Sequence, residues 1–197
     1  DMMCVPTMMV AFLSHPDRAK YDLSSLQGTV VAAAPAPVPL WGRVVKELGL
    51  IELTTGYGQT EAHGGTCISD PEATMDMLAH RVGGIKLGGT AALPEFHGSF
   101  CEYKVVDSAT GVDLPEGVEG ELVCRGATIT NGYYGSPDVN ARTFDKDGWM
   151  RTGDIGVIHD GGYIELTGRS KEIYIRGGEL VAPREVENYL SRHPKVN

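Results

Sequence analysis

The sequence predicts an α/β protein: the end of a βαβ-type layered subdomain, then a small antiparallel or distorted β-barrel subdomain, then the start of an α+β domain. Strand-like and helix-like apolar runs alternate over residues 7–55, which is typical of a βαβ unit. Residues 100–166 instead hold short alternating runs between glycines, and residues 183–190 begin an amphipathic helix. These changes of pattern predict three parts, 1–90, 91–167 and 168–197.

The first part is expected to contain two helices and two strands. In chain order they are a buried helix at 7–15, a buried strand at 29–34, a helix at 41–48 and a strand at 50–55. A proline-rich turn at 35–39 follows the first strand, and Gly56 ends the second. Because ligand loops in such units follow the carboxyl ends of strands, a site is expected after these two strands.

Glycine is unusually frequent, with 26 of 197 residues against an average of about 7%. Most of the excess falls in the second part, where strands are expected at 100–106, 120–125, 155–158 and 163–166. The turn Asp160-Gly161-Gly162 between the last two is typical of a hairpin. In the third part we expect a strand at 173–175, a glycine loop and a helix from 183.

Composition narrows the function classes. The formal net charge of −9 disfavours a nucleic-acid-binding groove, which needs a basic patch. The sequence contains no run of 18 apolar residues, so it predicts no transmembrane segment. The four cysteines lack the C-x-x-C spacing of a zinc or redox site. We therefore expect a cytoplasmic protein that binds small molecules, and its composition does not indicate an oligomeric state. Since Asp1 is not an initiator residue, we expect the chain to be a piece of a longer protein.

Five local motifs occur in order along the chain. They are Ala33-Ala34-Pro35; Tyr57-Gly58-Gln59-Thr60-Glu61; Gly120-Glu121-Leu122 with Gly132-Tyr133; Arg151-Thr152-Gly153-Asp154; and Gly168-Arg169-Ser170-Lys171-Glu172, followed by Gly177-Gly178 and Pro183-Arg184-Glu185-Val186-Glu187. Together they resemble the adenylate-forming (AMP-binding) superfamily, most of all its acyl-CoA synthetases, over essentially the whole chain. The resemblance implies that ATP, with Mg²⁺, activates a carboxylic acid, expected to be a fatty acid, as an acyl-adenylate. The acyl group then passes to CoA, and AMP is released.

Thr60 and Glu61 place a hydroxyl donor beside a carboxylate in a glycine-flanked loop. The pair suits a phosphate oxygen and the Mg²⁺ ion that bridges it. The resemblance implies the same catalytic roles, with Thr60 on the α-phosphate and Glu61 on the metal. Taken without the other motifs, the pair would be interpreted more simply as a helix N-cap and a first-turn carboxylate.

The resemblance assigns further residues to the nucleotide and the acyl group. Tyr57 is expected to stack on adenine within the nucleotide-binding stretch Thr55-Gly56-Tyr57-Gly58, and Thr55 stands where relatives often have Asn or Asp. Relatives often have Gly-Gly-Ala-Pro at Ala32-Ala33-Ala34-Pro35, whose last three residues are expected to contact the nucleotide. The methyl groups of Ala32 and Ala33 are expected to narrow the acyl pocket. His63 is a further candidate there, although a packing or surface role is the simpler interpretation.

Asp154 is a candidate ribose ligand, because one carboxylate can accept hydrogen bonds from two vicinal hydroxyls. The resemblance implies this role too, and it implies that Arg169 adds donors near the ribose or the phosphates. The simpler alternatives are a turn aspartate and a solvated surface ion pair.

Lys171 stands where the resemblance places the hinge of a rotating C-terminal lid domain. After the rotation Gly177 and Gly178 would line the tunnel that admits CoA, because glycine lets a loop approach a ligand closely. A plain turn is the alternative for this glycine pair.

The 197 residues contain no counterpart of the superfamily's Pro-Lys phosphate loop or of its acyl-activating lysine. Because such groups offset charge on the phosphates, we expect the chain alone to catalyse little or no adenylation. Two alternatives to an acyl-CoA ligase are an adenylation domain of a carrier-protein-dependent assembly line and a non-catalytic nucleotide-binding or interaction module.

Overall fold

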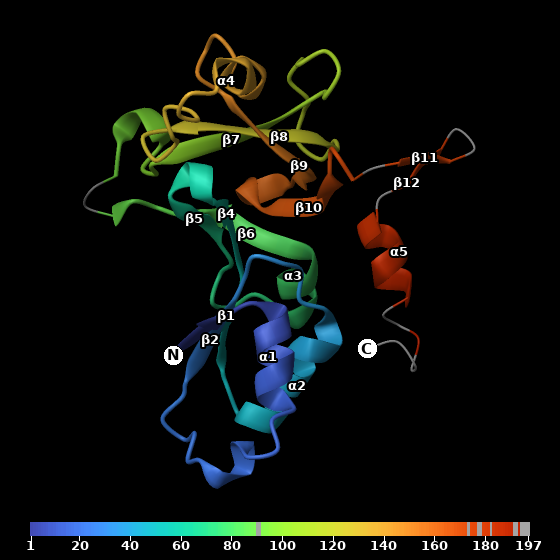
Figure 1. Ribbon diagram of the computed structural model, residues 1–197. Coiled ribbons are helices and arrows are strands. Elements are labelled where there is room, and N and C mark those ends of the chain that lie inside the picture. Colours follow the sequence, from blue (N-terminus) through green and yellow to red (C-terminus); the bar gives the residue numbers. More distant parts are fainter. Residues whose placement is uncertain (90–91, 173, 177–178, 182, 191–192, 194–197) are drawn as a thin grey trace. The chain divides into compact units, whose positions relative to one another are not determined.

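The computed structural model describes residues 1–89, 92–172, 174–176, 179–181, 183–190 and 193 (Figure 1). The chain divides into two compact units, Asp1–Lys86 and Leu87–Asn197. None of the described helices combines the length and the apolar character that crossing a membrane requires.

The first unit begins with a parallel sheet in the order β1-β2-β3. Its elements are β1 (Met2–Cys4), α1 (Pro6–Leu13), a 3-10 turn at Arg18–Lys20, β2 (Gly28–Val31), α2 (Val38–Leu48) and β3 (Glu52–Thr54). The core is built from fully buried apolar side chains such as Met9, Val31 and Trp41. Gly49 ends α2 in the left-handed conformation, with φ +68°, as is usual for a residue that closes a helix.

A second, antiparallel set of strands completes the first unit. It consists of β4 (Gly56–Gln59), β5 (Gly64–Ile68) and β6 (Arg81–Ile85), with a 3-10 turn at Thr60–Ala62 and the helix α3 (Met75–His80). The side chain of Thr74 caps α3 by accepting a hydrogen bond from the Met77 N–H at 3.2 Å.

The second unit is an antiparallel sheet in the order β7-β8-β9-β10 (Figure 1). Its elements are a 3-10 turn at Pro94–Phe96, β7 (Cys101–Val106), β8 (Gly120–Gly126), α4 (Pro137–Thr143), β9 (Met150–Ile158), a 3-10 turn at Asp160–Gly162 and β10 (Ile164–Arg169). The hairpin β11 (Tyr174–Arg176) and β12 (Glu179–Val181) and the helix α5 (Pro183–Leu190) follow. The expectation of an antiparallel or barrel-like unit is met by an antiparallel sheet, and these four strands do not close into a barrel.

The expected helices and strands are present where the structure describes them, and their differences in bounds have physical reasons. The helix expected at 41–48 starts earlier, at Val38, because proline is tolerated in the first helical turn. The strand expected at 29–34 ends at Val31, since Ala33 takes a positive φ of +69° that no strand contains. Thr60 and Glu61, expected in a glycine-flanked loop, lie in the turn that follows β4, and the strand β4 itself was not expected.

Candidate active site

The segment Ala32-Ala33-Ala34-Pro35 leaves the carboxyl end of β2 and is anchored on both sides. The Ala32 N–H donates to the Cys4 carbonyl at 3.1 Å. Just beyond the segment, the buried indole N–H of Trp41 donates to the Ala36 carbonyl at 3.0 Å. Ala32 is half-buried and residues 33–35 are exposed. The candidate nucleotide loop is therefore a short exposed arch with fixed ends.

Thr55 is buried at the end of β3, with 4% of its surface exposed. Its N–H donates to Ser69 Oγ at 3.0 Å, and its carbonyl accepts from the Ser69 N–H at 2.8 Å. Both backbone groups are thus engaged inside the unit, and Thr55 acts as an anchor for the start of β4. Its expected contact with adenine stays a prediction.

Gly56 and Gly58 are required by the packing of β4 against β5. A Cβ atom on Gly56 would lie 2.7 Å from the Cys67 carbonyl oxygen, and one on Gly58 would lie 1.6 Å from the Gly64 carbonyl oxygen. Tyr57 is 8% exposed, so little of its surface is open to a stacked base, and its carbonyl accepts from the Thr66 hydroxyl at 3.4 Å. This strand packing accounts for the two glycines without a ligand.

Thr60 and Glu61 occupy the single 3-10 turn that links β4 to β5. Ala62, which is 2% exposed, fixes the turn in the core, while Thr60 is exposed and Glu61 half-buried. Thr60 is not the N-cap, because Gln59 takes that position. His63 follows with a left-handed φ of +59° and an exposed side chain, and its place in an acyl pocket stays a prediction.

Glu61 fits a magnesium ion that arrives with phosphate ligands. Among the described residues, no three His, Cys, Asp or Glu side chains gather into a metal site. Mg²⁺ is usually held by one or two carboxylates, with substrate phosphates and water filling its other positions. A single carboxylate beside the Thr60 hydroxyl suits that mode of binding, and it does not suit a closed structural metal site.

Asp154 lies inside β9, directly across from Arg169 on β10. Asp154 is 5% exposed, and its Oδ1 is 3.1 Å from Nε of Arg169, whose side chain is 67% exposed. The aspartate is therefore not a turn residue, and the arginine does not pair with a solvated acid. A carboxylate with so little water around it needs a cationic partner, and Arg169 supplies one.

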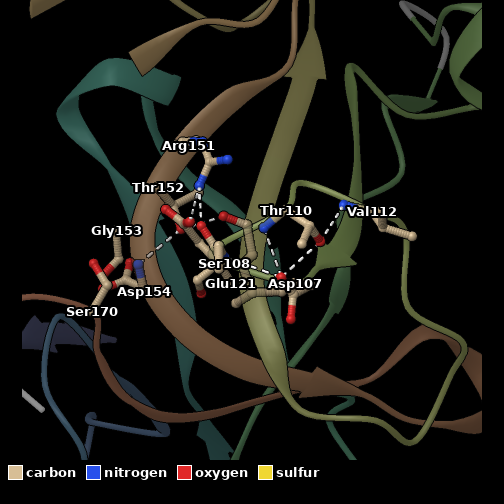
Figure 2. Close-up of polar contacts among 12 residues, drawn as sticks. Asp107, Ser108, Thr110, Val112, Glu121, Arg151, Thr152, Gly153, Asp154 and Ser170 are labelled. Carbon is tan, nitrogen blue, oxygen red and sulfur yellow. Dashed lines mark hydrogen bonds and ion pairs between the residues drawn. The ribbon is translucent and has the colours of Figure 1, made fainter. Parts of the chain in front are cut away.

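A second ion pair, which the sequence did not single out, joins β8 to β9. Arg151 Nη1 contacts Oε2 of Glu121, whose side chain is 7% exposed, and the same nitrogen donates to the Ser108 carbonyl at 3.3 Å (Figure 2). Both residues stood in recognised motifs, but only the pairing of β8 with β9 brings their side chains together, across a diagonal of the register. The pair ties the loop after β7 to the strand that carries Asp154.

The remaining candidates lie after β10. Lys171 is exposed in a turn, and Ser170 before it contacts β9. Gly177 and Gly178, expected at the CoA tunnel, fall outside the described residues.

Beneath this part of the second unit lies the fully buried thiol of Cys124. Burial is the largest cause that raises its pKa, from 9.0 to about 12, and the charges of Cys101 and Asp154 add to it. This thiol therefore stays protonated and unreactive near neutral pH.

The family model described as "AMP-binding enzyme" matches residues 1–134. The chain is 37% identical over 191 residues to a medium-chain acyl-CoA ligase, ACSF2, mitochondrial, of Mus musculus, covering 97% of this chain and 29% of the relative. A 3-[(3aS,4S,7aS)-7a-methyl-1,5-dioxo-octahydro-1H-inden-4-yl]propanoyl:CoA ligase of Rhodococcus jostii is 39% identical, covering 95% of this chain and 32% of the relative. The chain thus spans about a third of the length of the curated relatives that it matches.

The fold is also similar to that of a solved structure of a coenzyme A synthetase. O-succinylbenzoate coenzyme A synthetase from Bacillus subtilis, in complex with ATP and magnesium ion, is similar with a TM-score of 0.78 and 26% identity. The similarity covers 100% of this chain and 37% of that one.

Proposed function

Since the chain belongs to the AMP-binding enzyme family, we propose that it is the part of an AMP-forming acyl-CoA ligase that holds the adenylate. In the proposed reaction a carboxylate oxygen attacks the α-phosphorus of ATP and pyrophosphate leaves. The CoA thiol then attacks the acyl carbonyl, the thioester forms and AMP leaves. The activity belongs to a protein longer than these 197 residues.

One observation carries the proposal: a carboxylate withdrawn from water inside β9, Asp154, is paired with the mostly exposed Arg169. We assign Asp154 to the ribose hydroxyls, which a carboxylate accepts from, and Arg169 to the ribose or the nearby phosphate oxygens. The exposed Thr60 hydroxyl donates to an α-phosphate oxygen, and Glu61 offers its carboxylate to Mg²⁺. When bound, the ion offsets the charge that develops on the phosphates.

Three further assignments belong to the same proposal. The arch at residues 33–35 and Tyr57 border the adenine, and Ala32, Ala33 and His63 border the acyl group. A lid domain begins at residue 168, with its hinge at Lys171 and its CoA tunnel beside Gly177 and Gly178. The expected compartment is the cytoplasm, although the mouse relative is mitochondrial by name.

The test is carboxylate-dependent exchange of pyrophosphate into ATP by the full-length protein, followed by detection of the acyl-CoA product. Asp154→Asn should weaken AMP binding by about tenfold or more, the usual range for a hydrogen bond to a charged group. Asp160→Asn is the matched control, because Asp160 is exposed in the turn after β9. Transfer only to a carrier-protein thiol would favour the assembly-line alternative. AMP binding without any exchange would favour a non-catalytic module.

The acid is expected to be aliphatic and thin, such as a fatty acid, because the methyl groups of Ala32 and Ala33 take space that glycines would leave. Turnover across a series of straight-chain and aryl acids tests this expectation, and the highest turnover with a bulky aryl acid would refute it. The 197-residue chain alone is expected to give little or no exchange, and robust exchange by the purified chain would refute that.

A further inference from the structure

The strand that carries Asp154 departs from regular pairing directly before this residue. In the register of β8 and β9, Glu121 pairs with Ile155 and Val123 pairs with Arg151, so Leu122 alone faces residues 152–154. Gly153 within this bulge has φ +76°, a conformation that favours glycine. Bulges of this kind often redirect a side chain beside a functional site.

The Thr152 side chain fills the gap that the bulge opens in the backbone ladder. Its hydroxyl donates to the Leu122 carbonyl at 2.7 Å and accepts from the Asp154 N–H at 3.1 Å. These two bonds together require a short side chain whose hydroxyl, attached directly to Cβ, both donates and accepts. The backbone of Asp154 is thus held to β8 through one hydroxyl group.

The opposite side of the bulge is held from the end of β10. The Gly153 carbonyl accepts from the Ser170 N–H at 2.9 Å and from the Ser170 hydroxyl at 3.2 Å (Figure 2). Arg169 fixes the Asp154 carboxylate itself. With 5% of its surface exposed, Asp154 has little room to correct an error in the position of its backbone.

We propose that Thr152 is a positioning residue for ribose recognition, acting through Asp154 and not by touching the nucleotide. The proposal rests on the ribose role assigned to Asp154 above. It predicts that the hydroxyl at position 152 contributes to the affinity for nucleotides that carry ribose hydroxyls, and contributes nothing to the affinity for nucleotides that lack them.

The experiment compares AMP with 2′,3′-dideoxy-AMP by titration calorimetry on the full-length protein. Thr152→Val keeps the shape of the side chain and removes the hydroxyl, so it should weaken AMP binding by about tenfold and leave dideoxy-AMP binding unchanged. Thr152→Ser keeps the hydroxyl and should retain the preference for AMP. In an Asp154→Asn background, Thr152→Val should have no further effect on AMP binding.

The outcomes separate this proposal from the one on which it rests. If Asp154→Asn leaves the preference for AMP unchanged, the ribose role of Asp154 is wrong, and the role of Thr152 is wrong with it. If Asp154→Asn abolishes the preference and Thr152→Val does not reduce it, the role of Thr152 alone is overturned. Equal losses for both nucleotides in Thr152→Val would also overturn it, because they indicate a general structural defect.

If Thr152→Val does not fold, Thr152→Cys replaces it. A thiol is a weaker donor and acceptor than a hydroxyl, so an intermediate preference for AMP is expected. A wild-type preference in Thr152→Cys would overturn the proposal.

Discussion

The turn at Thr60–Ala62 and the bulge in β9 hold their candidate site residues in different ways. The turn is held mainly by its backbone, because glycines let β4 and β5 approach closely. The one buried side chain of the turn, Ala62, anchors it in the core. The bulge is held by side chains, because Thr152, Arg169 and Ser170 each bond one of its groups. The turn presents the exposed Thr60 and the half-buried Glu61, whereas the bulge presents the buried Asp154.

The difference shows that substitutions should act in distinct ways in the two regions. A backbone-held turn tolerates changes in its exposed side chains but not an added Cβ where two strands meet. A bulge held by side chains loses accuracy when a single hydroxyl or charge is removed. The first two of the four predictions that follow test this contrast, and the other two concern Cys124 and the arch after β2.

The largest effect is expected for Gly58→Ala. A Cβ atom at this position would lie 1.6 Å from the Gly64 carbonyl oxygen, so β4 and β5 must separate. The free energy of unfolding, measured by urea denaturation, should fall by about 4 kcal/mol or more, as for the most severe overpacking. Gly65→Ala is the control, because its Cβ would meet nothing within 4 Å and its φ is not positive. Equal losses in the two variants would contradict the close approach of the strands.

In the second unit, Arg151→Ala should lower the free energy of unfolding by about 3 kcal/mol, because it leaves the buried Glu121 carboxylate without its cation. Arg43→Ala removes an arginine from the more exposed ion pair with Glu47 and should have an effect below about 1 kcal/mol. Thermal unfolding of both variants is the measurement. Similar shifts would mean that the β8–β9 ion pair contributes no more than a surface pair.

Cys124 gives the second unit a specific sensitivity to alkali. Its folded pKa of about 12 lies above the ordinary 9.0, so its contribution to stability is complete below pH 9 and is lost as pH rises toward 12. At pH 10, which is one unit above the pKa of the thiol in the unfolded chain, the loss of stability amounts to about 1.4 kcal/mol. Denaturation between pH 8 and pH 10.5 should therefore show a shallower decline for Cys124→Ala than for the wild type. Parallel declines would refute the raised pKa.

The smallest effect concerns the arch after β2. Ala33 has φ +69°, where an L-residue with a Cβ is less stable than glycine by about 1 kcal/mol. Ala33→Gly should raise the free energy of unfolding by roughly that amount, whereas Ala34→Gly, whose φ is not positive, should lower it through the unfolded state. A loss of stability in Ala33→Gly would show that its methyl group makes contacts that outweigh the strain.

Much of the fold could be predicted from local patterns. The apolar run of α1, the helical pattern of α2 and the glycine punctuation of the second unit indicated the right classes of element. Several short elements were missed: β1, β4, β5, β6, β12, α3 and α4. Met2–Cys4, for example, is only three residues long, and Gly56–Gln59 lacks the branched side chains typical of strands.

The candidate site was predicted unevenly for the same reason. Motif order indicated Asp154, Arg169, Thr60 and Glu61, but a period of two along a strand leaves register shifts of two residues open and does not predict a bulge. The side-chain contact between Glu121 and Arg151, and the bulge that Thr152 fills, therefore became visible only in the paired strands.

The double hydrogen bond between Ser170 and Gly153 has a kinematic consequence. If the pivot of the proposed lid is at Lys171, Ser170 does not move with the lid. Both of its hydrogen bonds to Gly153 then survive the rotation, and the bulge keeps its shape. A pivot one residue earlier would pull two donors away from the Gly153 carbonyl at once and transmit each swing of the lid to Asp154. The position of the pivot thus decides whether Asp154 keeps its place throughout the catalytic cycle or loses it in every turnover.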